Sequence, residues 1–241
     1  MKKVEVCEQI KNIGIIPAIR VSSAEEAHFA AEAVMHGGIP IVEITMTVPE
    51  AVELISHLVR EHEELIVGAG TVLDTETARK CVDAGVQFLT APSFDLAIVE
   101  YAAKANIAVL PGALTPTEIV TAWKAGSDFV KVFPCALGGP QYIKALKTAL
   151  PQIPLIAAGG ITQQTAGNFI LAGATAIGVG TDLIPSRALE YREATRIREL
   201  AHRFAGFVAD ARRLLEPAKE PSQKPKTDFW KFHRHVHPGK P

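Results

Sequence analysis

Lys131 is the residue of this 241-residue chain whose placement most strongly suggests chemistry. It lies in the apolar run Asp128-Phe129-Val130-Lys131-Val132-Phe133-Pro134, which is typical of a buried strand. An unpaired buried charge is costly, and a desolvated lysine loses its proton more readily and becomes a nucleophile toward carbonyl carbon. The alternative is a lysine that extends from a strand end into solvent.

Glu43 and Arg20 occupy comparable places in two other apolar runs. Glu43 is the middle residue of Ile41-Val42-Glu43-Ile44-Thr45, and Arg20 ends the run that begins at Ile15. A carboxyl group facing the lysine could move protons during imine chemistry on a ketone, and the planar fork of arginine suits a substrate carboxylate. The alternatives are a buried ion pair that only offsets two charges and a rim arginine paired with a surface acid.

Apolar runs alternate with amphipathic ones up to about residue 213, as in a parallel sheet with helical crossovers. Eight strands are predicted: Ile15 to Arg20, Ile41 to Thr45, Leu65 to Gly68, Phe88 to Thr90, Ala108 to Leu110, Phe129 to Phe133, Leu155 to Ala157 and Ala176 to Val179. Helix start signals lie between them: Ser22 or Ser23, Pro49-Glu50, Asp74 or Thr75, Asp95, Thr115-Pro116 and Gly139-Pro140. This pattern predicts an α/β fold, a single-domain (β/α)8 TIM barrel with an N-terminal helix.

Such a barrel would bring the candidate residues together. Its second and sixth strands lie across the interior from each other, so Glu43 and Lys131 are expected to face one another, with Arg20 at the same mouth. Glycines follow the seventh strand at Gly159 and Gly160 and the eighth at Gly180, before Thr181. Barrels commonly bind phosphate at these two loops, because backbone without Cβ can approach an anion closely.

Composition excludes several function classes. The formal net charge is −1 and 48% of the residues are hydrophobic, which gives no electrostatic basis for binding nucleic acid or an anionic membrane. The three cysteines are scattered and accompany no secretory leader, so a cytoplasmic protein acting on a small molecule is expected.

The end of the chain has a different composition from the rest. Residues 216–241 contain five prolines and six Lys or Arg against three acidic residues, which predicts a solvated, irregular C-terminal tail after a barrel of residues 1–215. His233, His235 and His237 alternate, but without a carboxylate or fixed geometry they are weak metal ligands. No metal site is predicted.

Several segments in one order resemble the 2-keto-3-deoxy-6-phosphogluconate aldolase family, also called the 4-hydroxy-2-oxoglutarate aldolases. The matching segments are Glu43-Ile44-Thr45-Met46-Thr47-Val48-Pro49, Gly68-Ala69-Gly70-Thr71-Val72, Pro111 to Glu118, Lys131-Val132-Phe133-Pro134, Gly138 to Leu146 and the two glycine loops. The resemblance covers residues 5 to 213. It implies a cytoplasmic, homotrimeric class I aldolase of the Entner-Doudoroff type that needs no cofactor.

The resemblance also implies roles for individual residues. Lys131 matches the Schiff-base lysine and Glu43 the proton-transferring glutamate. Substrate contacts are implied at Arg20, Thr71, Pro92, Phe133, Gly159, Gly160, Gly180 and Thr181. Other members carry an arginine at the position of Thr47, so its absence here gives Arg20 more weight.

The chain also departs from the family pattern. Ala157-Ala158-Gly159-Gly160 replaces the Pro-Thr-Gly-Gly of many members and loses a hydroxyl group, while Ala91-Pro92-Ser93 and Thr181 are further differences. The expected reaction is cleavage of 2-keto-3-deoxy-6-phosphogluconate to pyruvate and glyceraldehyde 3-phosphate, or of 4-hydroxy-2-oxoglutarate to pyruvate and glyoxylate. The alternatives are a phosphogalactonate-type aldolase, a phosphosugar isomerase or synthase without a covalent intermediate, and a non-catalytic phosphosugar-binding barrel.

Overall fold

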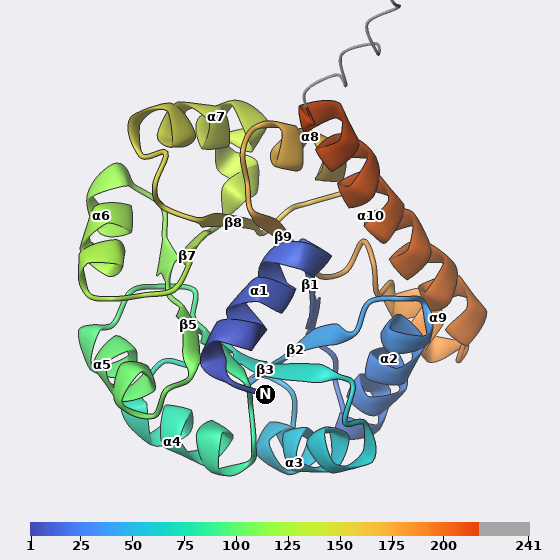
Figure 1. The fold of residues 1–241 in the computed structure, drawn as a ribbon. Coiled ribbons are helices and arrows are strands. Elements are labelled where there is room, and N and C mark those ends of the chain that lie inside the picture. Colours follow the sequence, from blue (N-terminus) through green and yellow to red (C-terminus); the bar gives the residue numbers. More distant parts are fainter. Residues whose placement is uncertain (217–241) are drawn as a thin grey trace, which may run out of the picture.

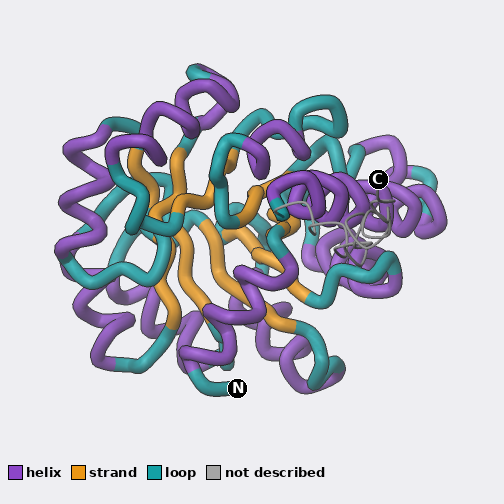
Figure 2. Tube along the Cα trace, turned by 45° about the horizontal axis from the view of Figure 1, so that its top comes forward, coloured by secondary structure: helices purple, strands orange, loops and turns teal. Residues whose placement is uncertain are grey.

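The computed structural model describes residues 1–216 as a ring of parallel strands surrounded by helices (Figure 1). The strand order is β5-β4-β3-β2-β1-β9-β8-β7-β6, with every observed pairing parallel. Figure 2 shows the strands enclosed by helices on the outside. The predicted (β/α)8 barrel is therefore confirmed, whereas the predicted tail lies outside the described residues except for Glu216.

The strands agree closely with the sequence prediction. They are β1 (Ile15–Ile19), β2 (Ile41–Thr45), β3 (Ile66–Gly70), β4 (Phe88–Thr90), β5 (Ala108–Leu110), β6 (Gly112–Ala113), β7 (Val130–Val132), β8 (Leu155–Ala158) and β9 (Ala176–Val179). The third strand was predicted to end at Gly68 but continues to Gly70, because Gly70 pairs in register with Thr45. The β7, β8 and β9 strands are the sixth, seventh and eighth of the barrel.

The fifth strand has the predicted bounds as β5, but after Pro111 a second short piece, β6, continues it, which was not predicted. Proline has no N–H to give to a ladder, so the strand is divided into β5 and β6 on either side. Two backbone hydrogen bonds join this divided strand to the β7 segment. The Asp128 N–H donates to Val109 O at 3.1 Å, and the Lys131 N–H donates to Pro111 O at 2.9 Å. These bonds close the ring.

The helices begin where local capping favours them. They are α1 (Lys3–Ile13), α2 (Ala24–His36), α3 (Ala51–Glu61), α4 (Thr75–Asp83), α5 (Leu96–Lys104), α6 (Pro116–Lys124), α7 (Gly139–Ala149), α8 (Ala166–Leu171), α9 (Ser186–Glu190) and α10 (Ala194–Leu215). The side chains of Ser23, Asp74, Asp95 and Thr115 accept hydrogen bonds from the first-turn N–H groups of α2, α4, α5 and α6. Each of these caps was among the predicted start signals.

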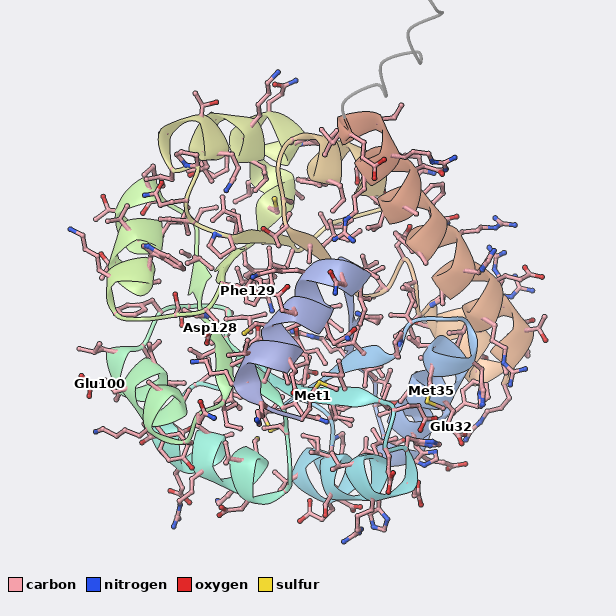
Figure 3. All side chains as sticks on the ribbon, viewed as in Figure 1. Met1, Glu32, Met35, Glu100, Asp128 and Phe129 are labelled. Atoms are coloured by element: carbon pink, nitrogen blue, oxygen red, sulfur yellow. The ribbon has the colours of Figure 1, made fainter. Side chains whose placement is uncertain are left out.

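Helix α1 covers one end of the barrel. It lies across the middle of the ring in Figure 1, and its own residues Val6 and Ile10 are buried. Lys3 forms an ion pair with Asp128 at 2.9 Å, and Figure 3 shows Asp128 and the buried Phe129 on this side, just before β7. Since α1 covers the end where the strands begin, only the opposite end, where they finish, is left for a site.

The barrel interior is filled by side chains and is not a pore. Phe88 is fully buried, and a Cβ added to Gly68 on the neighbouring strand would lie 2.2 Å from its ring. A glycine on β3 is therefore needed for the large Phe88 ring to fit. None of the helices within residues 1–216 combines the length and apolar composition that a bilayer crossing demands.

Candidate active site

Lys131 and Glu43 meet inside the barrel. Lys131 is the middle residue of β7 and Glu43 the middle residue of β2, and Lys131 Nζ lies 3.5 Å from Glu43 Oε1. The lysine side chain is 12% exposed and the glutamate side chain 5%. The contact expected from the strand positions is thus present, and the exposed part of the amine opens onto a cavity.

Thr90 is a third member of this group that the sequence analysis did not identify. It ends β4, is buried, and its Oγ1 accepts a hydrogen bond from Lys131 Nζ at 3.0 Å. The second, fourth and sixth strands of a barrel contribute side chains to shared layers. That rule could have located Thr90, since a threonine hydroxyl at the end of the fourth strand belongs beside Glu43 and Lys131.

Gly70 provides the space that Glu43 occupies. A Cβ on Gly70 would lie 2.0 Å from Glu43 Oε1 and 2.6 Å from its carboxyl carbon, far closer than atoms approach without bonding. Any other residue at this point of β3 would push the carboxylate out of its position. The glycine is therefore required by the close approach of a side chain.

Arg20 and Thr71 are joined at the mouth of the barrel. Arg20 Nη2 donates to Thr71 Oγ1 at 3.3 Å. Thr71 has a φ of 59°, a left-handed conformation that β-branched residues rarely adopt and that costs about 1–3 kcal/mol. Strained residues of this kind gather at functional sites, which makes the end of β3 part of the candidate site.

A cavity of about 270 Å³ contains most of the predicted site residues. Its lining includes Arg20, Glu43, Lys131, Phe133, Ala158, Gly159, Gly160, Gly180 and Thr181. Lys131 Nζ lies 5.6 Å from the centre of the Phe133 ring, and Gly159 and Gly160 both have a positive φ, at 85° and 81°. One concave surface thus combines an amine, a carboxylate, a guanidinium and backbone open to close approach.

Two predicted substrate contacts lie outside this lining. Thr71 does not line the cavity but accepts a hydrogen bond from Arg20, which does. Pro92 packs against the closing strand instead, since a Cβ on Gly112 would lie 2.2 Å from its carbonyl. The structure therefore gives Pro92 a packing contact with β6.

The cysteine thiols are poor candidates for a nucleophile. Burial raises the pKa of Cys135, which follows β7, to about 12, and that of Cys81 also to about 12. Both thiols stay protonated near neutral pH, and a thiol is far less nucleophilic than a thiolate. Lys131 is the nucleophilic group that the described part of the cavity lining offers.

Comparison with known proteins identifies the family. The family model described as "Aldolase: KDPG and KHG aldolase" matches residues 6–200. The chain belongs to this aldolase family. The resemblance expected from the sequence motifs is thereby confirmed, and the protein is an enzyme, an aldolase and therefore a carbon–carbon lyase.

Individual relatives support the same assignment. The aldolase is 33% identical over 204 residues to the 2-dehydro-3-deoxy-6-phosphogalactonate aldolase of Escherichia coli (strain K12), covering 84% of this chain and 96% of that protein. It is 32% identical over 189 residues to the KHG/KDPG aldolase of the same strain, covering 78% of this chain and 88% of that protein. The two identities are too close to distinguish the substrates.

A solved structure also matches the fold. The KDPG aldolase from Legionella pneumophila, with pyruvate captured at low pH as a covalent carbinolamine intermediate, superposes with a TM-score of 0.75 at 27% identity. The match covers 81% of this chain and 96% of that one.

We predict that Gly70→Ala lowers kcat for aldol cleavage at least about ten-fold, because a displacement of about 1 Å in a catalytic group can cost about 10² in rate. Steady-state pyruvate release measures the effect. Gly206→Ala is the matched control, since a Cβ there meets nothing within 4 Å. Equal activity of the two variants would show that the position of Glu43 does not limit turnover.

Proposed function

We propose that this aldolase cleaves 2-keto-3-deoxy-6-phosphogluconate to pyruvate and glyceraldehyde 3-phosphate through a Schiff base on Lys131. The observation that carries the proposal is the 3.5 Å contact between Lys131 Nζ and Glu43 Oε1 inside the cavity. An amine and a carboxylate at this distance can pass a proton directly or through one water molecule. Because the family also contains 4-hydroxy-2-oxoglutarate aldolases, we propose 4-hydroxy-2-oxoglutarate as a second substrate.

The first half of the reaction forms the covalent intermediate. The neutral Lys131 amine attacks the C2 carbonyl, and Glu43 moves protons so that the carbinolamine oxygen leaves as water. The result is a protonated imine between Lys131 Nζ and C2. Thr90 Oγ1, 3.0 Å from this nitrogen, helps to orient the amine before attack.

The second half breaks the carbon–carbon bond. Glu43, through water, takes the proton of the C4 hydroxyl, the C3–C4 bond breaks, and its electron pair moves into the imine to form an enamine. Glyceraldehyde 3-phosphate leaves as the aldehyde. Protonation of the enamine at C3 and hydrolysis of the imine then release pyruvate and free the Lys131 amine.

Binding contacts are assigned to the two sides of the cavity. Arg20, held by Thr71, suits the substrate carboxylate because its guanidinium can contact both oxygens. Arg20 and Thr47 also line one adjoining cavity, so an arginine from either place could serve the same region. Gly159, Gly160, Gly180 and Thr181 form the phosphate side, where backbone N–H groups and a hydroxyl can reach the anion.

A phosphogalactonate substrate is the second candidate. Ala158 lines the cavity where many family members have a threonine, so this chain lacks one hydroxyl that could contact the sugar. The 33% identical relative named a phosphogalactonate aldolase points in the same direction. We further infer a cytoplasmic homotrimer and a barrel domain that ends at residue 215, both from the family resemblance and the chain composition.

Borohydride reduction in the presence of pyruvate tests the imine. We expect a stable adduct on the peptide that contains Lys131, detected by mass spectrometry, because the reduced imine is a secondary amine that no longer hydrolyses. Lys104→Ala, on the exposed surface of α5, should keep the adduct and Lys131→Ala should lose it. A folded protein without an adduct at Lys131 would rule out the imine mechanism.

Glu43→Gln should lower kcat by about 10² or more, since the amide keeps the shape of the carboxylate but cannot accept a proton. Stopped-flow or coupled measurement of pyruvate release gives kcat, and circular dichroism checks the fold. The same substitution at Glu100, which Figure 3 shows on the outer ring, is the control and should leave kcat unchanged. Unchanged turnover of the Glu43 variant would reject its role in proton transfer.

Substrate preference is decided by comparing kcat/KM for three compounds. We expect the phosphogluconate epimer to give the highest value and unphosphorylated hydroxy-oxoglutarate a higher KM, because it lacks the phosphate contacts. A higher kcat/KM for the galactonate epimer would instead select the second candidate. Binding of all three without pyruvate release would leave only a phosphosugar-binding barrel.

A further inference from the structure

A cluster of imidazole and carboxylate side chains lies on the outside of the barrel, between α2 and α3. These helices are neighbours in the outer ring (Figure 1), and the cluster is made by His28 and Glu32 on α2 with Glu61 and His62 at the end of α3. None of the four lines the cavity that contains Lys131. The aldolase mechanism therefore gives these residues no role.

The local backbone explains why the four side chains converge. His28 and Glu32 are four residues apart and so share one face of α2. Consecutive residues of a helix point in different directions, but His62 is the C-cap of α3, with φ −130° and ψ 86°. Leaving the helical conformation lets His62 turn toward the same place as Glu61.

The distances within the cluster suit a metal ion. One donor atom from each of His28, Glu61 and His62 lies within 4.8 Å of the others, and His28 Nε2 is 2.9 Å from Glu61 Oε2. Bonds of about 2.0–2.2 Å in a tetrahedral Zn²⁺ site hold ligand atoms roughly 3.3–3.6 Å apart. The His28 and Glu61 side chains are 34% and 49% exposed, so both have room for the small movement required.

One ring nitrogen without a hydrogen-bond partner among the described residues, His62 Nε2, distinguishes this cluster from an ordinary network of ion pairs. This nitrogen is buried. Its nearest carboxylate oxygen, Glu32 Oε1, is 3.9 Å away, which is beyond hydrogen-bond range. A buried polar atom without a partner is costly, and a metal ion among these donors would accept its lone pair.

We propose that His28, Glu61 and His62 bind a divalent transition metal of the Zn²⁺ class that joins α2 to the end of α3. Two imidazoles and a carboxylate are ligands that Zn²⁺ accepts. Glu32 Oε2 lies 3.6 Å from His28 Nδ1, just beyond hydrogen-bond range, on the opposite side of the ring from Glu61; a shift of a few tenths of an ångström would let it orient the metal-bound ring. Glu32 itself projects from α2 in the outer ring (Figure 3).

Zinc titration of the full, metal-free chain tests this site. Because His233, His235 and His237 could bind Zn²⁺ themselves, the background carries His233→Ala, His235→Ala and His237→Ala. We expect this background to bind one equivalent of Zn²⁺ by calorimetry. Its Tm should rise by about 5–10 °C at a Zn²⁺ concentration about 100-fold above Kd.

Variants of the cluster identify the ligands. In the same background His28→Ala and His62→Ala should each weaken Zn²⁺ binding more than about ten-fold and, at the same Zn²⁺ concentration, reduce the rise in Tm to about half or less. Glu61→Gln is the mildest change, at a half-exposed side chain, and should weaken binding with the fold intact by circular dichroism. His202→Ala on the exposed face of α10 is the control and should change nothing. No Zn²⁺ uptake by the background, or equal affinity of the cluster variants and His202→Ala, would overturn the proposal.

Discussion

The contact between Lys131 and Glu43 is the interaction on which the rest of the site depends. Each charge alone would be costly in the barrel interior, and removing one partner of such a buried pair typically costs about 3–5 kcal/mol. Here the pair is only partly enclosed, because the lysine side chain keeps 12% of its surface exposed beside the cavity. The amine is thus held in one place by Glu43 and Thr90 and still accessible to a small keto acid.

Closure of the barrel positions this pair. The fifth strand is interrupted at Pro111, whose carbonyl accepts the Lys131 N–H at 2.9 Å, so the seam of the ring holds the backbone of the candidate nucleophile. On the opposite side, Gly70 leaves the space that the Glu43 carboxylate fills. Helix α1 covers the far end, which leaves one open mouth. The geometry of the candidate site and the stability of the fold therefore rest on the same contacts.

The outer ring of helices is not chemically uniform. Helix α2 follows β1 and Arg20, and helix α3 follows β2, which carries Glu43. The proposed metal cluster joins these same two helices on their solvent side. The His28 side chain holds the pKa of Glu61 below its usual range by hydrogen bonding, so this carboxylate is ionised at neutral pH. A charged carboxylate beside two imidazoles is an arrangement that either ion pairing or a metal can stabilise, and the buried His62 nitrogen favours the metal.

Alternating apolar runs and capping residues such as Asp74, Asp95 and Thr115 determined the strand and helix order, because these signals act between residues near in sequence. Barrel symmetry then sufficed to pair Glu43 with Lys131. Only the tertiary structure revealed the space at Gly70, the packing of Pro92 against Gly112 and the histidine cluster. Those features depend on atoms brought within a few ångströms by ring closure and helix packing, and local sequence patterns carry no information about such distances.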